Sequence, residues 1–358
     1  MEKISIIMPI NNAASYLKQS LECILEQEFQ DFKLILINDG SIDKSASICM
    51  EYAKRDSRIM VYHQMSQGIG VARNKGIQLA QGKYILFVDP NECIVPNLLK
   101  DIYELVETEQ TEWIVWSLRK ILYNKANNLV GNESVQATEI RCKTKVECKK
   151  HFIEMIKWQS LLLESTCNKL YKREIIESNN LKFGTIRGQQ DIVFNLEYFK
   201  CISSFIATPQ IYSNLHILEQ DCESKVVQEY YDSTYFIHYR YRHLLNQWSG
   251  ERVELGLVEY HFLTDIINIM KYCMRPTWKI SFFKRYIYIR KLMKKLEVKE
   301  AVNYVTQQNQ VKELGGRKMD WKINCIKKQK VLGMIIIYYV ENILRGKQKN
   351  NMQELSDI

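Results

Sequence analysis

Strand-like and helix-like segments alternate through the first 110 residues of this chain, and this alternation restricts the possible folds more than any other feature of the sequence. Short apolar runs typical of buried strands are separated by segments with helical periodicity. The expected strands cover residues 4–8, 32–38, 59–63 and 84–88, and the expected helices cover residues 15–27, 45–55 and 70–82, with Gly82 closing the last. Repeated β-α units predict an α/β, Rossmann-like domain with a mostly parallel sheet and helices on both faces.

Three polar stretches follow the expected strands. They are "PINN" at residues 9–12, "NDGSID" at 38–43 and "DPNE" at 89–92. Ligands of open α/β sheets bind at the carboxyl ends of the strands. We therefore expect the three stretches to meet in one crevice.

The "NDGSID" stretch has two interpretations. Asp39 follows a strand, and Gly40 lets the backbone approach closely, so the carboxylate could accept hydrogen bonds from a ligand. Alternatively, Ser41 or Asp43 caps the helix that follows, which needs no ligand. The residues alone leave both interpretations open.

The composition changes further along the chain. Residues 111–215 mix strand-like and helix-like segments, and the helical segment 187–201 has Asp191 near its start, where the helix dipole favours an acid. From residue 216 onward Gly and Pro are sparse, and amphipathic helical patterns dominate. The sequence therefore predicts an α/β domain over residues 1–215 and a helical C-terminal region over residues 216–358.

Several of these segments together resemble the family 2 glycosyltransferases of the GT-A fold. The resembling segments are residues 4–64, 67–92, 167–175 and 189–195, so the resemblance covers roughly residues 1–215. It implies a GT-A domain and an inverting transferase that uses a nucleotide sugar. Such enzymes are common in bacterial polysaccharide assembly, with a growing glycan or a lipid-linked glycan as acceptor.

The resemblance also implies roles for single residues. Asp39 matches the aspartate that binds the nucleotide base, Arg73 matches an arginine near the nucleotide, and Asp191 matches the usual catalytic base. The other expected contacts to the nucleotide sugar are Pro9, Asn11 and Asp89. An acceptor hydroxyl must lose its proton as it attacks the anomeric carbon, and a positioned carboxylate can take that proton.

The "DPNE" loop matches a family loop that usually reads "DSDD" and holds Mg²⁺ or Mn²⁺ against the donor diphosphate. A divalent cation neutralises the leaving group and prefers carboxylate oxygens. The expected metal ligands here are Asp89, Asn91 and Glu92. Asn91 replaces a carboxylate, and Pro90 stiffens the loop.

Two further positions depart from the family pattern. Asn11 stands where a tyrosine is common, and Gln190 stands where a glutamate is common. Two functions therefore stay open. The chain could be an active transferase that moves a sugar from a UDP-sugar to a hydroxyl of a growing glycan, or a weak or inert GT-A protein that binds an active transferase. "GIGVAR" at 68–73 lacks the third glycine of a dinucleotide fingerprint, so an oxidoreductase is not favoured.

Net charge and cysteine content indicate the cellular compartment and the partners of the protein. The formal net charge is +9, which suggests an anionic partner or a solvated basic surface. The ten cysteines form no CxxC pair, which predicts a reducing compartment and buried thiols. The N-terminus reads as a strand rather than a signal peptide. We expect a cytoplasmic protein, with contact to the inner face of the cell membrane as one option.

Two basic segments near the C-terminus support that option. Residues 284–296 interleave cations with aromatic side chains, and residues 331–340 form an apolar run that is bracketed by lysines and too short to span a bilayer. Both segments fit an anionic membrane surface. A solvated or core-packed helix and a homo- or hetero-oligomer contact are the alternatives. No nucleic-acid motif accompanies them, so nucleic acid is not an expected partner.

Overall fold

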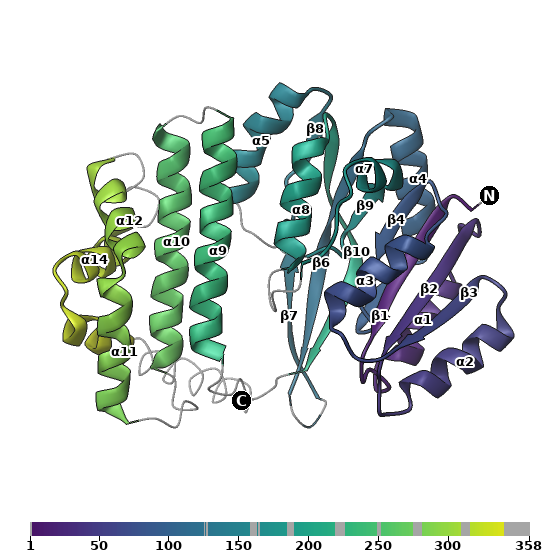
Figure 1. Cartoon of the computed structure of the whole chain (residues 1–358), viewed down its shortest axis with the longest axis horizontal. Coiled ribbons are helices and arrows are strands. Elements are labelled where there is room, and N and C mark those ends of the chain that lie inside the picture. The colour runs from purple at the N-terminus through teal and green to yellow at the C-terminus, as the bar shows by residue number, and fades with distance from the viewer. Residues whose placement is uncertain are drawn as a thin grey trace, which may run out of the picture. The chain divides into compact units, whose positions relative to one another are not determined.

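A computed structural model of the chain describes residues 2–124, 126, 128–157, 163, 165–184, 190–218, 226–248, 252–274, 281–308 and 316–339. The chain divides into two compact units, residues 1–220 and 221–358 (Figure 1). The last strand of the first unit runs to Leu218 and thus passes residue 215, where the sequence analysis placed the domain boundary.

The first part of unit 1 has the predicted β-α alternation. Its elements are β1 (Ile4–Ile10), α1 (Leu17–Leu25), β2 (Phe32–Asp39), α2 (Ser45–Arg55), β3 (Ile59–Gln64), α3 (Ile69–Leu79) and β4 (Tyr84–Phe87). The strands pair in parallel in the order β3-β2-β1-β4 (Figure 1). The prediction of an α/β domain with a parallel sheet is confirmed for this region.

Strand β1 is buried on both faces, as expected for a central parallel strand. Ile4, Ile6 and Met8 join a core that also contains residues of α1, α2 and α4. Ile7 points to the opposite face, where a Cβ atom on Gly76 of α3 would come within 2.3 Å of it. Helices therefore cover both faces of the sheet.

The second part of unit 1 extends this sheet with mixed pairing. Its elements are β5 (Glu92–Ile94), α4 (Leu98–Glu109), β6 (Trp113–Tyr123), β7 (Leu129–Val135), β8 (Ile140–Cys142), α5 (Lys145–Lys157), β9 (Lys169–Lys172), α7 (Arg173–Ser178), α8 (Gln190–Cys201) and β10 (Phe205–Leu218). The strand order is β3-β2-β1-β4-β9-β6-β10-β5, and in addition β7 pairs with β6 and β8 pairs with β10. β9 is antiparallel to β4 and β6, whereas β10 is parallel to β6 and antiparallel to β5.

Two local predictions need correction. Strand β1 continues through Pro9 to Ile10, although the sequence predicted its end at residue 8. Pro9 is tolerated because it lies beyond the last β1–β4 pair, Ile7 with Phe87, so its missing N–H removes no bond from that ladder. Gly82 does not close α3, which ends at Leu79. A Cβ atom on Gly82 would lie 2.6 Å from the Ser5 backbone nitrogen, so the glycine permits close packing against β1.

Unit 2 is helical and has its own core. It contains α9 (Val226–Gln247), α10 (Arg252–Cys273), α11 (Phe282–Lys294), α12 (Leu296–Gln307), α14 (Gly316–Lys327) and a further helical run over residues 331–339. The Tyr338 hydroxyl donates to the Ile267 carbonyl at 2.8 Å inside this core. Within the described ranges, no helix has the length and apolar character needed to cross a membrane.

Candidate active site

The carboxyl ends of β1 and β2 lie side by side and carry two of the predicted residues. Asp39 is the last residue of β2, and Asn11 follows β1. The Asn11 Nδ2 atom donates to the Asp39 carbonyl at 2.6 Å. Asn11 thus fixes the end of β2, a role that an asparagine fills with its amide.

The Asp39 carboxylate holds the loop between β3 and α3. It accepts hydrogen bonds from the Gln64 side chain and from the backbone N–H groups of Gln67 and Gly68, each at 2.8 Å. The side chain is 3% exposed. A nucleotide base would therefore reach this carboxylate by displacing the Gln64 amide. Base binding by Asp39 stays a prediction.

The turn after Asp39 explains why Gly40 and Asp43 occur at their positions. Gly40 has φ +66°, and a Cβ atom there would lie 2.6 Å from the Ser66 nitrogen, so the turn requires glycine. Asp43 accepts the N–H of Ser45, the first residue of α2, at 2.9 Å, and the N–H of Ala14 at 3.0 Å. Asp43 thus fixes the turn before α2, but the N-cap residue of that helix is Lys44 and has no side-chain cap, so the capping interpretation is wrong for Asp43, and Asp39 performs a different task.

Arg73 on α3 connects two of the predicted site residues. Its Nη1 atom lies 2.6 Å from Asp191 Oδ1, and its Nη2 atom lies 3.0 Å from Asp89 Oδ1. The guanidinium is 2% exposed, whereas the Asp89 and Asp191 side chains are 28% and 21% exposed. Burial alone would lower the pKa of Arg73, but the two carboxylates outweigh it and raise that pKa. Arg73, Asp89 and Asp191 thus form one charged cluster with its acids open to solvent.

Asp191 stands in the first turn of α8. Besides Arg73, it contacts Thr166, whose hydroxyl donates to Oδ2 at 3.2 Å. Burial raises the pKa of Asp191, while Arg73 opposes that rise. An ionised carboxylate has about four lone-pair sites, so these two contacts leave capacity to accept a further proton donor.

Glu92 is almost fully buried, unlike Asp89 and Asp191. Its side chain is 2% exposed, and burial together with the charge of Asp89 raises its pKa to about 8. The Asp89 backbone N–H donates to Glu92 Oε2 at 3.3 Å, and Ser213 also forms a hydrogen bond with the carboxyl group. The raised pKa favours the protonated form of Glu92 near neutral pH. Glu92 as a metal ligand stays a prediction, and its burial weighs against it.

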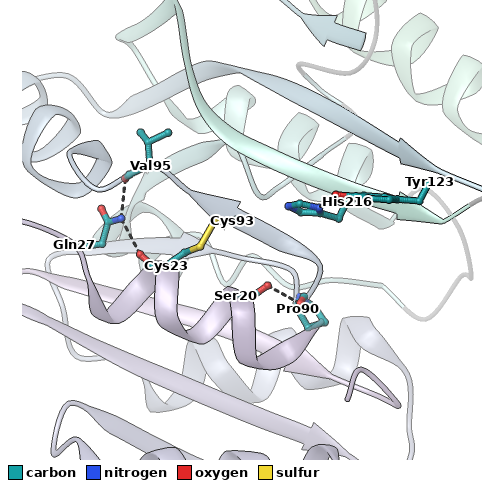
Figure 2. The surroundings of a disulfide bond; sticks show 8 residues. All are labelled: Ser20, Cys23, Gln27, Pro90, Cys93, Val95, Tyr123 and His216. Atoms are coloured by element: carbon teal, nitrogen blue, oxygen red, sulfur yellow. Dashed lines mark hydrogen bonds between the residues drawn. A yellow bond between two sulfur atoms is a disulfide. The ribbon is translucent and has the colours of Figure 1, made fainter. Parts of the chain in front are cut away.

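The loop of residues 89–92 is anchored to β10. The Asn91 Nδ2 atom donates to the His216 carbonyl, and the His216 N–H donates to the Asn91 carbonyl, both at 2.9 Å. The Tyr123 hydroxyl lies 3.1 Å from His216 Nδ1, and the two rings are stacked (Figure 2). These contacts turn the Asn91 amide nitrogen toward β10.

Helix α1 holds the other side of this loop (Figure 2). The Ser20 hydroxyl donates to the Pro90 carbonyl at 2.6 Å, and Gln27 donates to the Val95 carbonyl at 2.7 Å. A disulfide joins Cys23 of α1 to Cys93 of β5. The loop is therefore fixed from both sides.

The disulfide corrects the prediction that the cysteines are thiols. Cys23 and Cys93 are 70 residues apart in sequence and belong to no motif, so no local signal revealed their pairing. Cysteines outside this bond, among those that the structure describes, are Cys49, Cys142, Cys148, Cys167, Cys201, Cys273 and Cys325. All but Cys201 are buried, as predicted. Cys222 lies outside the described residues.

A divalent cation fits this loop only in part. Among the described residues, no group of three or more His, Cys, Asp or Glu side chains is arranged to hold a metal ion. Asp89 supplies one accessible carboxylate, and Asn91 supplies a neutral Oδ1 atom. Mg²⁺ commonly uses one or two carboxylates plus the phosphates of a substrate. The residues therefore fit a cation that arrives with a diphosphate, and they do not fit a metal centre built from protein ligands alone.

Sequence reasoning missed several residues of this site. Thr166 contacts Asp191, Gln64 contacts Asp39, and His216 anchors Asn91. Each contact joins segments that are distant in sequence. Gln190 Oε1 and Arg73 Nε are buried without a hydrogen-bond partner among the described atoms, which marks this cluster as incomplete without a ligand or water.

Comparisons with known proteins identify a matching family and several similar proteins. Residues 5–179 match the model of the family described as "Glycosyl transferase family 2". The chain is 27% identical over 288 residues to the putative glycosyltransferase EpsH of Bacillus subtilis, covering 79% of each protein. It is 32% identical over 202 residues to the uncharacterized glycosyltransferase EpsJ of the same organism, and it spans 56% of that protein.

A solved structure supports the fold over nearly the whole chain. Residues 1–349 of TarS from S. aureus superpose with a TM-score of 0.63 at 15% identity, covering 96% of this chain and 92% of that one. The complex of TarS with UDP-GlcNAc gives a TM-score of 0.65. At this identity the likeness concerns the fold alone, and it confirms the predicted GT-A domain followed by a helical region.

Proposed function

Because residues 5–179 place this chain in glycosyl transferase family 2, we propose that it transfers a sugar from a nucleotide sugar to a hydroxyl group of a growing glycan. Family membership supports the role in glycan biosynthesis. The inverting course of the reaction, the donor and the acceptor belong to the proposal.

The observation that carries the proposal is the Arg73 cluster. One buried guanidinium contacts both the acid after β4 and the acid at the start of α8. The first acid belongs to the loop that would face the donor diphosphate, and the second is the expected base. Holding both acids on one rigid cation fixes the distance between donor and base, as transfer to a bound acceptor requires.

Asp191 would act as the general base. Its raised pKa brings it closer to neutral pH, where a base combines the correct protonation state with useful basicity. Arg73 keeps the carboxylate ionised before the acceptor binds and stabilises its position. Attack by the deprotonated hydroxyl on the face opposite the leaving diphosphate would invert the anomeric configuration.

The donor would bind at the ends of β1, β2 and β4. Pro9 lies one residue before the end of β1 and Asn11 follows that strand, and Asp39 with the loop it holds would meet the nucleotide. The bound UDP-GlcNAc of TarS supports a UDP-sugar as donor. Asp89 and Asn91 would hold Mg²⁺ or Mn²⁺, which, when bound, neutralises charge on the diphosphate.

A weak or inert protein that binds an active transferase is the second candidate. The specific observation in its favour is the loss of charge in the "DPNE" loop. Burial and the charge of Asp89 raise the pKa of Glu92 and favour its protonated form, and Asn91 is neutral, so the loop carries less negative charge than a loop of ionised carboxylates. Such a loop would hold a cation weakly.

Nucleotide binding separates the two candidates. Calorimetry or thermal melting with UDP, GDP and dTDP, with and without Mn²⁺, should give a response to UDP, because a ligand of the native state stabilises it. No response to any of the three nucleotides would favour the inert candidate. If UDP binds, a screen of UDP-sugars for release of UDP identifies the donor.

The variant Asp191→Asn tests the catalytic role. Sugar transfer should fall by about 10²- to 10⁴-fold, the usual contribution of a general base, while UDP binding stays unchanged. Asp56→Asn is a matched control, because Asp56 also pairs with an arginine, Arg58, but at the end of α2. Joint loss of transfer and UDP binding in the Asp191 variant would contradict the assignment.

A further inference from the structure

We propose that unit 2 carries a binding site for an anionic lipid bilayer, formed by an apolar surface on α11 and on the helical run 331–339. This apolar surface consists of Phe282, Phe283, Ile287, Leu332, Ile336 and Tyr339, which are 37–69% exposed. The partner is the headgroup region of a membrane with acidic lipids. The inference does not depend on sugar transfer.

The net positive charge of the chain comes from unit 2 alone. Residues 1–220 contain 26 Lys and Arg and 26 Asp and Glu, so they carry no net charge. Residues 221–358 contain 24 and 15, which accounts for the whole excess of +9. Within residues 271–330 there are 17 cations and 4 acids, a net charge of +13. A segment of this charge attracts acidic headgroups.

The helical run 331–339 exposes apolar side chains only. Leu332, Ile336 and Tyr339 are 56%, 59% and 65% exposed and follow the spacing i, i+4, i+7, so they lie on one face. The opposite face, which includes Met334 and Tyr338, packs into the unit 2 core. A helix that is apolar all round normally has both faces covered. Its outer face therefore needs a partner, and the lysines before it match an acidic one.

Helix α11 carries exposed apolar and exposed basic side chains along a single stripe. Phe283 and Ile287 are followed at helical spacing by Arg290 and Lys294, and all four side chains are exposed. Ile289, Leu292 and Met293 bury the inner face. Apolar side chains beside cations on the outer face are what a helix lying in the bilayer interface requires.

The two helical segments adjoin each other. The Gln329 Nε2 atom donates to the Met293 carbonyl at 2.8 Å, which places the turn before residue 331 against the end of α11. Both segments pack on the same core cluster. Their outer faces can therefore contact one bilayer together.

A second copy of this chain fits the apolar surface less well. Pairing two copies through it would bring two regions of charge +13 together, and like charges across an interface oppose association. Acidic lipid removes this repulsion and also accepts the apolar side chains. Electrostatic attraction and apolar insertion act together at such a surface, and each alone binds weakly.

Vesicle sedimentation with the full chain tests the proposal. Phosphatidylcholine vesicles and vesicles that also contain phosphatidylglycerol are compared. Binding should be at least about tenfold tighter to the acidic vesicles and should weaken strongly at about 1 M salt, where the Debye length is about 3 Å. Absence of binding to acidic vesicles at low salt would overturn the proposal.

Paired variants separate the apolar and the charged contributions. Phe283→Ser with Ile336→Ser should weaken binding by about tenfold or more, since each side chain loses its insertion into the bilayer. Arg290→Gln with Lys294→Gln should weaken it by about fivefold for each cation. The matched control, Leu129→Ser with Val130→Ser, removes apolar side chains of similar exposure (63% and 57%) from β7 of unit 1 and should change nothing.

The remaining outcomes are decisive as well. Equal loss in the control variant would mean that any exposed apolar side chain suffices, which contradicts the assignment. If Phe283→Ser with Ile336→Ser dissociates an oligomer in the absence of lipid and leaves vesicle binding unchanged, the surface is a contact between copies. UDP binding, measured in the same samples, reports separately on the site in unit 1.

Discussion

Both units bury one acidic or basic side chain between two polar partners, yet the two clusters are built differently. In unit 1 the buried ion is the cation Arg73, and its partners Asp89 and Asp191 are 28% and 21% exposed. The three residues come from α3, from the loop after β4 and from α8, which are far apart in sequence.

In unit 2 the buried ion is the anion Glu259, which is 2% exposed. Its Oε2 atom lies 3.0 Å from His238 Nε2, and its Oε1 atom lies 3.0 Å from Arg242 Nε. His238 and Glu259 are both buried, and all three residues belong to the neighbouring helices α9 and α10.

The difference separates a functional cluster from a structural one. A buried ion pair is weak evidence for stability, because desolvation offsets its Coulomb energy. Partners that stay partly exposed and meet at the carboxyl ends of parallel strands remain available to a ligand. In unit 2, Arg242 is itself 38% exposed, so position rather than exposure marks this cluster: its partners lie on two adjacent helices and hold α9 against α10. The following predictions test this distinction.

The largest expected effect follows removal of the central cation of unit 1. Arg73→Met leaves Asp89 and Asp191 without a counter-ion, so Asp191 should bind a proton more tightly and lose its role as a base. We expect sugar transfer to fall by about a hundredfold or more. The unfolding free energy should fall by about 1–3 kcal/mol, less than for a fully buried pair because both acids reach solvent.

Release of UDP from the donor and chemical denaturation measure these two effects. Arg58→Met is the control, because Arg58 pairs with Asp56 and lies over the Phe32 ring, outside the proposed site. It should leave transfer intact. Full activity of Arg73→Met would show that the unit 1 cluster is structural, like that of unit 2.

The second prediction concerns the disulfide that holds the "DPNE" loop. Cys23→Ser with Cys93→Ser opens a loop of 70 residues, which should lower the unfolding free energy by about 2–4 kcal/mol. A reductant should reproduce the loss in the unmodified chain and have no effect on the double variant. Equal stability with and without reductant would mean that this bond contributes nothing to unit 1.

These long-range contacts mark where sequence reasoning stops. The strands and helices before residue 88 were predictable because each is specified by its own periodicity. The Asp39, Asp89 and Asp191 roles came from the family resemblance. The Arg73–Asp191 contact spans 118 residues, and local patterns carry no information about such pairs.

The burial of Glu92 was unpredictable for the same reason. Strand β5 pairs with β10, and Leu215 lies opposite Glu92, so the carboxyl group is enclosed by a segment more than a hundred residues away. In sequence, Glu92 is one more acid in an acidic loop. Only the sheet order shows that it faces the interior.

The third prediction addresses the unit 2 cluster. Glu259→Gln should lower the unfolding free energy by about 1–3 kcal/mol, because the amide no longer compensates Arg242 and His238. UDP binding and sugar transfer, measured well below the melting temperature, should not change. Gln247→Glu, at the exposed end of α9, serves as a control for altered charge on the same helices. Loss of UDP binding in Glu259→Gln would mean that the two clusters are coupled.

The last prediction, the pH dependence of Glu92, is best measured in a chelator so that no cation contributes. Because the folded-state pKa is raised to about 8, the proton is held more tightly in the folded than in the unfolded chain. Its stabilising contribution is complete below the unfolded pKa of about 4.5 and is lost as pH rises through 8.

Glu92→Gln mimics the protonated form, so it should match the unmodified chain near pH 5 and be more stable above pH 8, by up to about 1.4 kcal/mol for each pH unit between the unfolded and the folded pKa. Thermal melting across this range measures the difference. Parallel curves at all pH values would place an ionised Glu92 in the folded chain and return it to the set of accessible metal ligands.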